Sequence, residues 1–317
     1  MPSMHEGPLR CGIIGAGKFA ATHAAVLTRL PYTSLTAVCD IDRKQCTDFT
    51  EKWGGSPCAD LPTLLSERLD LLVIATPDRT HASALQSILA APDPPRMLIV
   101  EKPLCTSAKE LALLRTLVPK YQTRIIVDHS RRFSAGVCRM RDILRSGELG
   151  QLRSVHWTYY AGWFHTGVHV VDTLRMLMGE CACTGAELAG TGRSADDPLL
   201  RVTLTAKGPP EIPIVLDGVS DSPYELFEAE FICSTGRMRM YWNDVFIDRI
   251  RQGTYAPMLW FSEHFTVDPI EEALTTLYSS CNAALHGEDA PLLDGTDFAA
   301  ACGTMEILFE AMSKAQA

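Results

Sequence analysis

The chain is 317 residues long, carries a formal net charge of −9 and contains 46% hydrophobic residues. This length exceeds the usual size of one domain, so we expect two domains with an ample core. The negative charge argues against a nucleic-acid backbone or an anionic membrane as a partner, because both would require clustered Lys and Arg.

The first predicted strand, residues 9–14, leads into Gly15-Ala16-Gly17-Lys18-Phe19-Ala20 and then into a helical pattern over residues 19–30. This arrangement is typical of a strand–turn–helix that binds a dinucleotide, although the same string also occurs in ordinary loops. The first glycine allows a tight turn, the second lets a pyrophosphate approach, and the small third residue lets the helix pack on the strand. We therefore expect the phosphates at the helix start, beside Gly15, Gly17, Lys18 and Phe19.

The second predicted strand, residues 35–39, ends in Asp40. Its carboxylate could accept both hydroxyls of an adenosine ribose and would repel a 2′-phosphate, which favours NAD over NADP. Arg43 and Lys44 follow this acid and could bind a 2′-phosphate. The more ordinary interpretation of this basic pair is the solvated first turn of the next helix.

Short apolar runs continue to alternate with helical patterns up to about residue 130, which predicts a parallel sheet covered on both faces. The further strands are expected over residues 69–75, 97–100 and 124–127, and the helices over residues 61–67, 81–90, 107–117 and 135–146. Ligands of such sheets bind beyond the carboxyl ends of the strands. Those ends carry Gly15, Asp40, Thr76-Pro77, Glu101-Lys102-Pro103 and Asp128-His129.

The segment Glu101-Lys102-Pro103 follows a buried strand at the place where the domain would face a nicotinamide ring. A lysine there could hydrogen-bond a substrate hydroxyl and lower the pKa of the group that loses its proton. Two structural alternatives stay open, in which Lys102 pairs with Glu101 or caps the strand end.

From residue 152 the pattern changes to alternating strands, expected over residues 155–160, 201–205 and 227–231. Such alternation predicts an antiparallel sheet with one wet face and one covered face. Helical patterns occur over residues 168–178, 270–286 and 297–314. We therefore predict a dinucleotide-binding domain over residues 1–130 and an α+β domain over residues 131–317.

Three polar side chains stand at the start of the first of these helices. His165, His169 and Asp172 are spaced i, i+4 and i+7, so one helical face could present them together. His169 could be a general acid/base assisted by Asp172, because the pKa of an imidazole lies close to working pH. Alternatively, the three residues could bind a metal, or His169 could be a core histidine with hydrogen-bond partners.

Together these motifs resemble the glucose-fructose oxidoreductase / inositol dehydrogenase / MocA family over nearly the whole chain. The resemblance rests on Gly15 to Ala20, Asp40, Ala75-Thr76-Pro77-Asp78 with His81, Glu101-Lys102-Pro103, Arg131-Arg132-Phe133 and His169-x-x-Asp172. It implies a doubly wound Rossmann domain followed by an α+β domain with a large, mostly antiparallel open sheet.

The resemblance also implies that Lys102 and His169 lie on opposite sides of the substrate carbon, with Asp172 nearby, while hydride passes to or from C4 of the nicotinamide. It implies a cis bond between Lys102 and Pro103, and a homodimer or homotetramer formed through the C-terminal sheet. Further residues of the matching motifs are expected to contact the cofactor or the substrate. They are Thr76, Pro77, His81 and Glu101 for the cofactor, and Arg132 and His165 for the substrate.

Two departures from the family pattern concern the substrate side. Many members carry an acid four residues before the catalytic histidine, whereas this chain has His165. The segment between Tyr160 and His165 is also short where relatives often have a long loop. This version resembles members of sugar and polysaccharide pathways, including nucleotide-sugar oxidoreductases.

We predict an NAD-dependent oxidoreductase that acts on a secondary alcohol or ketone of a sugar or sugar derivative, without a metal. The alternatives are a dehydrogenase for a cyclitol or small polyol, and a regulatory NAD-binding sensor without turnover. The N-terminus lacks the apolar core of a secretory signal, and the eleven scattered cysteines suggest free thiols. We therefore expect a cytoplasmic protein.

Overall fold

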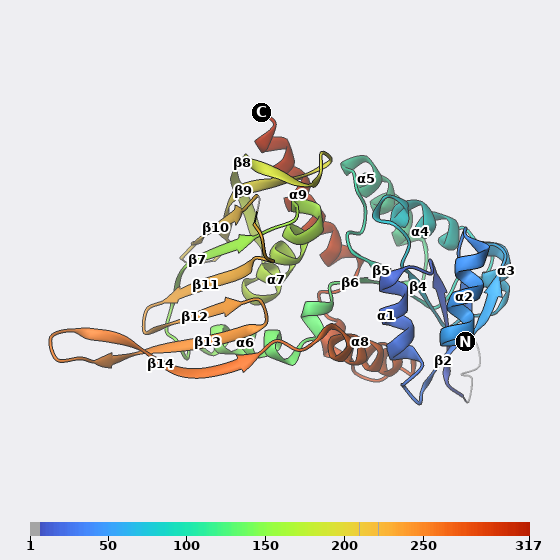
Figure 1. The fold of residues 1–317 in the computed structure, drawn as a ribbon, viewed down its shortest axis with the longest axis horizontal. Coiled ribbons are helices and arrows are strands. Elements are labelled where there is room, and N and C mark those ends of the chain that lie inside the picture. The colour runs from blue at the N-terminus through green and yellow to red at the C-terminus, as the bar shows by residue number, and fades with distance from the viewer. Residues whose placement is uncertain (1–6, 209, 221) are drawn as a thin grey trace. The chain divides into compact units, whose positions relative to one another are not determined.

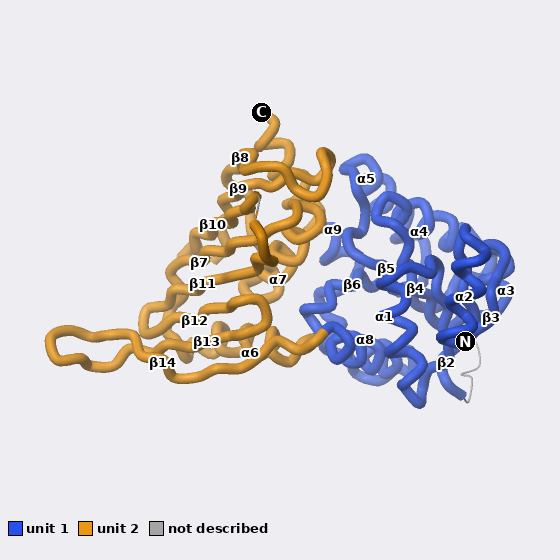
Figure 2. Tube along the Cα trace, viewed as in Figure 1, with its two compact units in different colours: residues 1–133, 270–302 blue, residues 134–269, 303–317 orange. Residues whose placement is uncertain are grey.

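The computed structural model describes residues 7–208, 210–220 and 222–317, and the chain forms two compact units (Figure 2). The first unit contains Met1–Phe133 and Ile270–Cys302, and the second contains Ser134–Pro269 and Gly303–Ala317. These units differ from the predicted division at residue 130, because residues 131–133 and 270–302 belong to the first unit. Helix α8 (Ile270–Leu285) buries its apolar face in the core of the first unit, and the periodicity of a helix does not reveal which sheet it covers.

The first unit is built on a parallel sheet with the strand order β3-β2-β1-β4-β5-β6 (Figure 1). Its strands are β1 (Leu9–Ile14), β2 (Thr33–Cys39), β3 (Ser56–Cys58), β4 (Leu71–Ile74), β5 (Met97–Glu101) and β6 (Arg124–Asp128). Strands β4 and β5 are buried along their whole length, as expected for strands covered on both faces. The order reverses between β1 and β4, and this is where doubly wound sheets bind ligands. The predicted Rossmann topology is confirmed.

Helices cover both faces of this sheet. They are α1 (Lys18–Leu27), α2 (Arg43–Trp53), α3 (Leu61–Ser66), α4 (His81–Leu89), α5 (Ala108–Leu117) and α8. Side chains cap several of them: Asp42 accepts from the N–H of Gln45 at α2, and Ser107 and Glu110 form a capping box at α5. Helix α1 differs because its N-cap is Gly17, which offers no side chain. The start of α1 is thus left open for another group.

The second unit contains a mostly antiparallel sheet with the order β14-β13-β12-β11-β7-β10-β9-β8 (Figure 1). Its strands are β7 (Leu152–Tyr159), β8 (Cys181–Ser194), β9 (Asp197–Ala206), β10 (Ile212–Gly218), β11 (Phe227–Cys233), β12 (Gly236–Tyr241), β13 (Asp244–Gln252) and β14 (Pro257–Thr266). Strands β7 and β10 pair in parallel, and the other neighbours are antiparallel. The predicted open α+β sheet is confirmed.

Strand β7 shows how the faces of this sheet differ. Val155, Trp157 and Tyr159 are buried, whereas the intervening His156 is exposed and Thr158 is half-buried. Helices α6 (Ala135–Ser146), α7 (Val168–Met178) and α9 (Phe298–Ala315) belong wholly or mainly to this unit. Among the residues that the structure describes, no helix combines the length and apolar character that crossing a membrane requires.

Candidate active site

The glycine turn between β1 and α1 has the geometry of a phosphate-binding loop. Gly15 has φ +96°, and a Cβ there would approach the carbonyl oxygen of Ala75 to 2.5 Å, so only glycine fits. A Cβ on Gly17 would meet no atom within 4 Å, which shows open space beside the turn. The first turn of α1 has no acidic residue, and Lys18 and Phe19 within it are exposed. The unpaired N–H groups that begin any helix fit a pyrophosphate here.

Asp40 lies beside this turn at the carboxyl end of β2. Its Oδ2 accepts from the N–H of Ala16 at 2.7 Å and its Oδ1 accepts from the N–H of Asp42 at 2.8 Å. These bonds fix the carboxylate next to the phosphate loop. Lys44 forms an exposed ion pair with Asp48 at 2.6 Å on α2. This contact agrees with the interpretation of the basic pair as the solvated first turn of a helix.

Ile41 is a residue that the sequence reasoning missed. Its side chain is fully exposed directly after Asp40. An exposed apolar side chain in this position offers a contact surface for a ring of a ligand. The sequence did contain a signal for it, because Ile41 is a single apolar residue between Asp40 and Asp42 in a turn.

His81 ties together the loops that follow β4 and β5. Its ring is buried, with Nδ1 2.7 Å from the carbonyl oxygen of Pro103 and Nε2 2.7 Å from that of Thr76. Both nitrogens are therefore engaged with the backbone, and His81 shapes the loops rather than offering a free nitrogen to a cofactor. Pro77 follows Thr76 in the first loop, and the Lys102–Pro103 bond in the second is cis, as the resemblance implied.

Glu101 ends β5 and Lys102 follows it, and each residue is largely buried, at 8% exposed. Oε1 of Glu101 lies 3.0 Å from Nε2 of His23, a fully buried residue of α1. The same nitrogen lies 3.5 Å from Oδ2 of Asp128 at the end of β6, and Nδ1 of His23 lies 2.6 Å from the hydroxyl of Tyr278 on α8. The first unit thus holds a buried cluster of ionisable groups. One member of the cluster, Glu101, directly precedes Lys102 in the sequence.

The charges in this cluster shift one another. Burial and the charge of Glu101 raise the pKa of Asp128 to about 7. Burial disfavours the charged form of His23, but its hydrogen bond to Glu101 and the charges of both carboxylates raise its pKa overall. Burial opposes ionisation of Glu101 as well, yet the hydrogen bond and charge of His23 hold its pKa below the ordinary value. At neutral pH, Glu101 is ionised and Asp128 is the carboxyl group that titrates.

Arg132 lies in the short helix η3 (Ser130–Phe133) that follows β6, and it is largely buried. A Cβ on Gly295 would come within 3.3 Å of Nη1 of Arg132, so the guanidinium packs against that glycine. The structure therefore brings this predicted substrate residue close to the C-terminal segment of the first unit.

Helix α7 of the second unit carries His169 and Asp172 one turn apart. His169 is half-buried and Asp172 is buried. Oδ1 of Asp172 accepts from the hydroxyl of Thr304 on α9 at 3.3 Å, and this hydroxyl accepts from Nη1 of Arg175 at 2.8 Å. These hydrogen bonds fix the orientation of the Asp172 carboxylate on α7.

His165 does not lie in the regular α-helical turn that the spacing predicts. It belongs to a wider π-helical turn, Trp163–Gly167, in which the N–H of Gly167 bonds to the carbonyl of Gly162 at 3.1 Å. The carboxylate of Asp197 accepts from the N–H groups of Phe164 and His165 at 2.6 and 3.1 Å and so holds this turn. His165 and His169 therefore do not lie on one continuous α-helix, which the prediction from their i, i+4 spacing assumed.

The side chain of His165 contacts Arg193 of β8, with Nη1 of the arginine 2.8 Å from Nε2 of the imidazole. Sequence reasoning missed Arg193 and Asp197, because they lie 28 and 32 residues further along the chain and no local pattern links them to the turn. Arg193 and Asp197 contact the turn at His165 because the β8–β9 hairpin brings the chain back to it.

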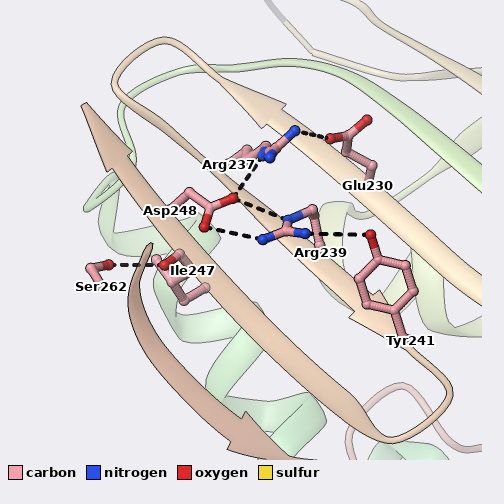
Figure 3. A network of polar contacts seen from close by, with 7 residues as sticks. All are labelled: Glu230, Arg237, Arg239, Tyr241, Ile247, Asp248 and Ser262. Atoms are coloured by element: carbon pink, nitrogen blue, oxygen red, sulfur yellow. Dashed lines mark hydrogen bonds and ion pairs between the residues drawn. The ribbon is translucent and has the colours of Figure 1, made fainter. Parts of the chain in front are cut away.

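The face of the second sheet that carries His156 is strongly charged. Nε of Arg237 and Nε of Arg239 donate to Oδ2 of Asp248 at 2.7 and 3.0 Å, and Arg237 also donates to Glu230 at 2.8 Å (Figure 3). Burial opposes the ionisation of Asp248, but the two arginines hold its pKa below the ordinary value. A hollow of about 270 Å³ on this face is lined by His156, Thr158, Glu228, Ala229, Glu230, Arg237, Arg239 and Tyr241.

Comparison with known proteins gives a family match for the first part of the chain. Residues 9–129 match the oxidoreductase family with an NAD-binding Rossmann fold. Over 192 residues the chain is 30% identical to inositol 2-dehydrogenase 4 from Saccharopolyspora erythraea, a match that covers 56% of this chain and 56% of that protein. The chain spans about half the length of the curated relatives it matches.

Two solved structures share the fold over nearly the full length. A 3-ketoreductase from Actinomadura kijaniata, in complex with NADP and TDP-benzene, superposes with a TM-score of 0.77 at 18% identity and covers 97% of this chain and 98% of its own. An oxidoreductase from Agrobacterium radiobacter, in complex with NAD⁺, L-tartaric acid and magnesium, gives a TM-score of 0.77 at 16% identity, covering 97% and 96%. At these identities the likeness establishes the fold.

Proposed function

Because the Rossmann domain of this chain, residues 9–129, belongs to the glucose-fructose oxidoreductase / inositol dehydrogenase / MocA family, we propose that the protein is an NAD-dependent oxidoreductase. It interconverts a secondary alcohol and a ketone on a sugar or a sugar derivative, including one linked to a nucleotide. The observation that carries this proposal is the open glycine turn at the β1–β4 reversal in the same sheet that presents Lys102.

The first unit binds the cofactor in this proposal. The turn at Gly15 and Gly17 receives the pyrophosphate, Asp40 binds the adenosine ribose, and Thr76 and Pro77 line the path to the nicotinamide. When bound, NAD supplies the hydride acceptor at C4 of its nicotinamide. Lys102 donates a hydrogen bond to the substrate oxygen and stabilises negative charge that develops there.

His169 acts as the general base for the alcohol proton and returns it in the reverse direction. Asp172 is its positioning residue, because the hydrogen bond from Thr304 holds the carboxylate in one orientation. An oriented carboxylate favours one imidazole tautomer and stabilises the imidazolium that forms.

His165 and Arg132 bind the substrate in this proposal. The guanidinium of Arg193 holds the imidazole of His165, with Nη1 2.8 Å from Nε2 and 3.2 Å from Nδ1. The two side chains together offer polar groups to the hydroxyls of a polyhydroxylated substrate.

The choice of NAD rests on Asp40, whose fixed carboxylate would repel a 2′-phosphate. Calorimetric titration with NADH and NADPH tests it, and tighter binding of NADH is expected. Absorbance screening of NAD⁺ reduction with sugars, nucleotide sugars and cyclitols tests the reaction itself. Tighter binding of NADPH would reverse the cofactor assignment and direct attention to Arg43.

A cyclitol or small polyol is the second candidate substrate. The similarity to inositol 2-dehydrogenase 4 favours it, at 30% identity over 192 residues. Comparing kcat/KM for inositols with that for nucleotide sugars separates the two candidates.

We also propose that the protein forms a homodimer or homotetramer through the C-terminal sheet. The β13–β14 hairpin extends past its neighbours (Figure 1) and exposes the apolar side chains of Ile250, Met258, Leu259, Trp260 and Phe261. Exposed apolar clusters of this kind mark association sites. Sedimentation analysis of wild type and Trp260→Ser tests it, and a monomeric wild type would contradict it. All eleven cysteines are present as thiols, which supports a cytoplasmic location.

A further inference from the structure

Behind Lys102 lies a cluster whose members come from four separate elements. His23 is on α1, Glu101 on β5, Asp128 on β6 and Tyr278 on α8. One ring nitrogen of His23 and one carboxylate oxygen each of Glu101 and Asp128 lie within 4.8 Å of one another, and all three residues are buried. Buried charged groups are costly unless they are paired, so this juxtaposition requires a chemical explanation.

His23 can change its charge here without moving. Its Nε2 faces two carboxylates, Glu101 at 3.0 Å and Asp128 at 3.5 Å, while its Nδ1 faces the hydroxyl of Tyr278 at 2.6 Å. A neutral ring donates from Nε2 to Glu101 and accepts at Nδ1 from Tyr278. An imidazolium donates from both nitrogens, and Tyr278 becomes the acceptor after rotation of its hydroxyl hydrogen.

Asp128 is the member whose ionisation is least supported. Among the described residues, its buried Oδ1 has no hydrogen-bond partner, and such an oxygen favours the protonated acid over the carboxylate. Glu101 accepts the shorter bond from His23 and stays ionised. The distance of 3.5 Å between Nε2 and Oδ2 lets one proton pass from the imidazolium to the Asp128 carboxylate, which leaves both groups neutral.

We propose that His23 and Asp128 form a buried proton-binding pair that acts through Glu101 on Lys102, so that loss of the proton from the pair stabilises the Lys102 ammonium. The inference rests on the proposed function, in which Lys102 contacts the substrate oxygen. His23, Glu101 and Asp128 are positioning residues in it. The charge of Lys102 stabilises the ionised forms of Glu101 and Asp128, and by reciprocity their carboxylates stabilise the Lys102 ammonium.

Other ionisable groups also face the cluster. They are Cys11 on β1, His81 on α4, Tyr278 and Cys281 on α8, and Arg124 at the start of β6. Burial raises the pKa of Cys11 to about 12 and that of Tyr278 well above its ordinary value, so these two stay neutral in the physiological range. Both ring nitrogens of His81 are held by backbone carbonyls. Nε2 of His23 and Oδ2 of Asp128 face each other directly at 3.5 Å, so the proposed exchange of protons is assigned to these two residues.

The test is a pH titration of the folded protein by NMR, with ¹⁵N-labelled histidine and ¹³C-labelled lysine. In wild type, the shifts of His23 and Lys102 are expected to move together in a step near neutral pH. In Asp128→Asn, the titration midpoints of both groups are expected to fall, by roughly one pH unit for a charge removed at this range. The matched control is Asp93→Asn, since Asp93 is an exposed loop residue and its loss should leave both midpoints unchanged.

Kinetics gives a second readout. The basic limb of the kcat/KM profile of Asp128→Asn is expected to move to lower pH together with the Lys102 midpoint, which a purely structural role would not cause. Unchanged His23 and Lys102 midpoints in folded Asp128→Asn would overturn the proposal. If that variant does not fold, a wild-type His23 signal that stays constant between about pH 5.5 and 8.5 would overturn it instead. If the His23 and Lys102 shifts of wild type move together but the protein turns over no substrate, the result would count against the proposed function alone.

Discussion

Replacing Asp128 by asparagine should change how the stability of the protein depends on pH. The pKa of Asp128 is about 7 in the folded protein and 3.8 as its ordinary value. Between these two values the folded state holds a proton that the unfolded state has released. The free energy of unfolding therefore falls as the pH rises through this window. An asparagine side chain at this position cannot titrate, so the variant should lose this part of the slope.

The size of the effect follows from the shift. About 3 pH units at about 1.4 kcal/mol per unit give about 4 kcal/mol between pH 4 and pH 7. Two other members of the cluster contribute at the edges of this window. The lowered pKa of Glu101 gives stability that is lost in acid below its ordinary value of 4.5, and the raised pKa of His23 gives stability that is lost above 6.5.

Urea unfolding of wild type, Asp128→Asn and Asp93→Asn at several pH values between 4 and 8 measures this directly. The wild type and the Asp93→Asn control should lose stability in parallel across the window. The curve of Asp128→Asn should be flatter, so that the variant gains on wild type by up to about 4 kcal/mol at the upper end. Identical pH dependence in all three proteins would refute the reasoning that Asp128 holds its proton up to neutral pH.

Four further predictions concern the site. Asp40→Ala should reduce the preference for NADH over NADPH, measured as the ratio of the two Kd values; an unchanged ratio would remove Asp40 from the ribose site. His165→Asn should mainly raise KM and leave kcat close to wild type, whereas a fall in kcat with a shifted acidic limb would make it a proton relay. Thr304→Val should lower thermal stability by about 1–3 kcal/mol, because it removes a buried hydroxyl that bonds to both Asp172 and Arg175, and it should lower kcat without changing NADH affinity. Exhaustive chelation should leave the rate unchanged, and a loss that stoichiometric Zn²⁺ restores would support the metal interpretation of His165, His169 and Asp172.

Local patterns predicted the strand and the helix on either side of the glycine turn well. The run Gly15 to Ala20 requires a turn with positive φ, and β1 and α1 begin and end close to the expected residues. Helix α7 has the predicted bounds, because its apolar periodicity is strong and Gly179 follows it. Strand β3 was not predicted, since its three residues include Pro57 and only Cys58 is buried.

Features that depend on distant segments could not be predicted. The π-helical turn at His165 exists because Asp197 binds its backbone from another strand. The cluster at Glu101 needs Tyr278, which is 255 residues from its partner His23. A partial signal for this cluster was present: His23 lies on the buried face of α1, and Asp128 ends an apolar strand. Each polar group on an apolar face requires a partner, but the sequence does not identify it.

The most direct test of the proposed function compares the reduction of NAD⁺ by wild type and Lys102→Met over a panel of sugars, nucleotide sugars and cyclitols. Wild type should form NADH with at least one of these substrates. Lys102→Met should bind NADH with unchanged affinity and be slower by about 10²- to 10⁴-fold, the usual contribution of such a group. A wild type that binds NADH but reduces NAD⁺ with no member of the panel, or a Lys102→Met variant that turns over at the wild-type rate, would contradict the proposal.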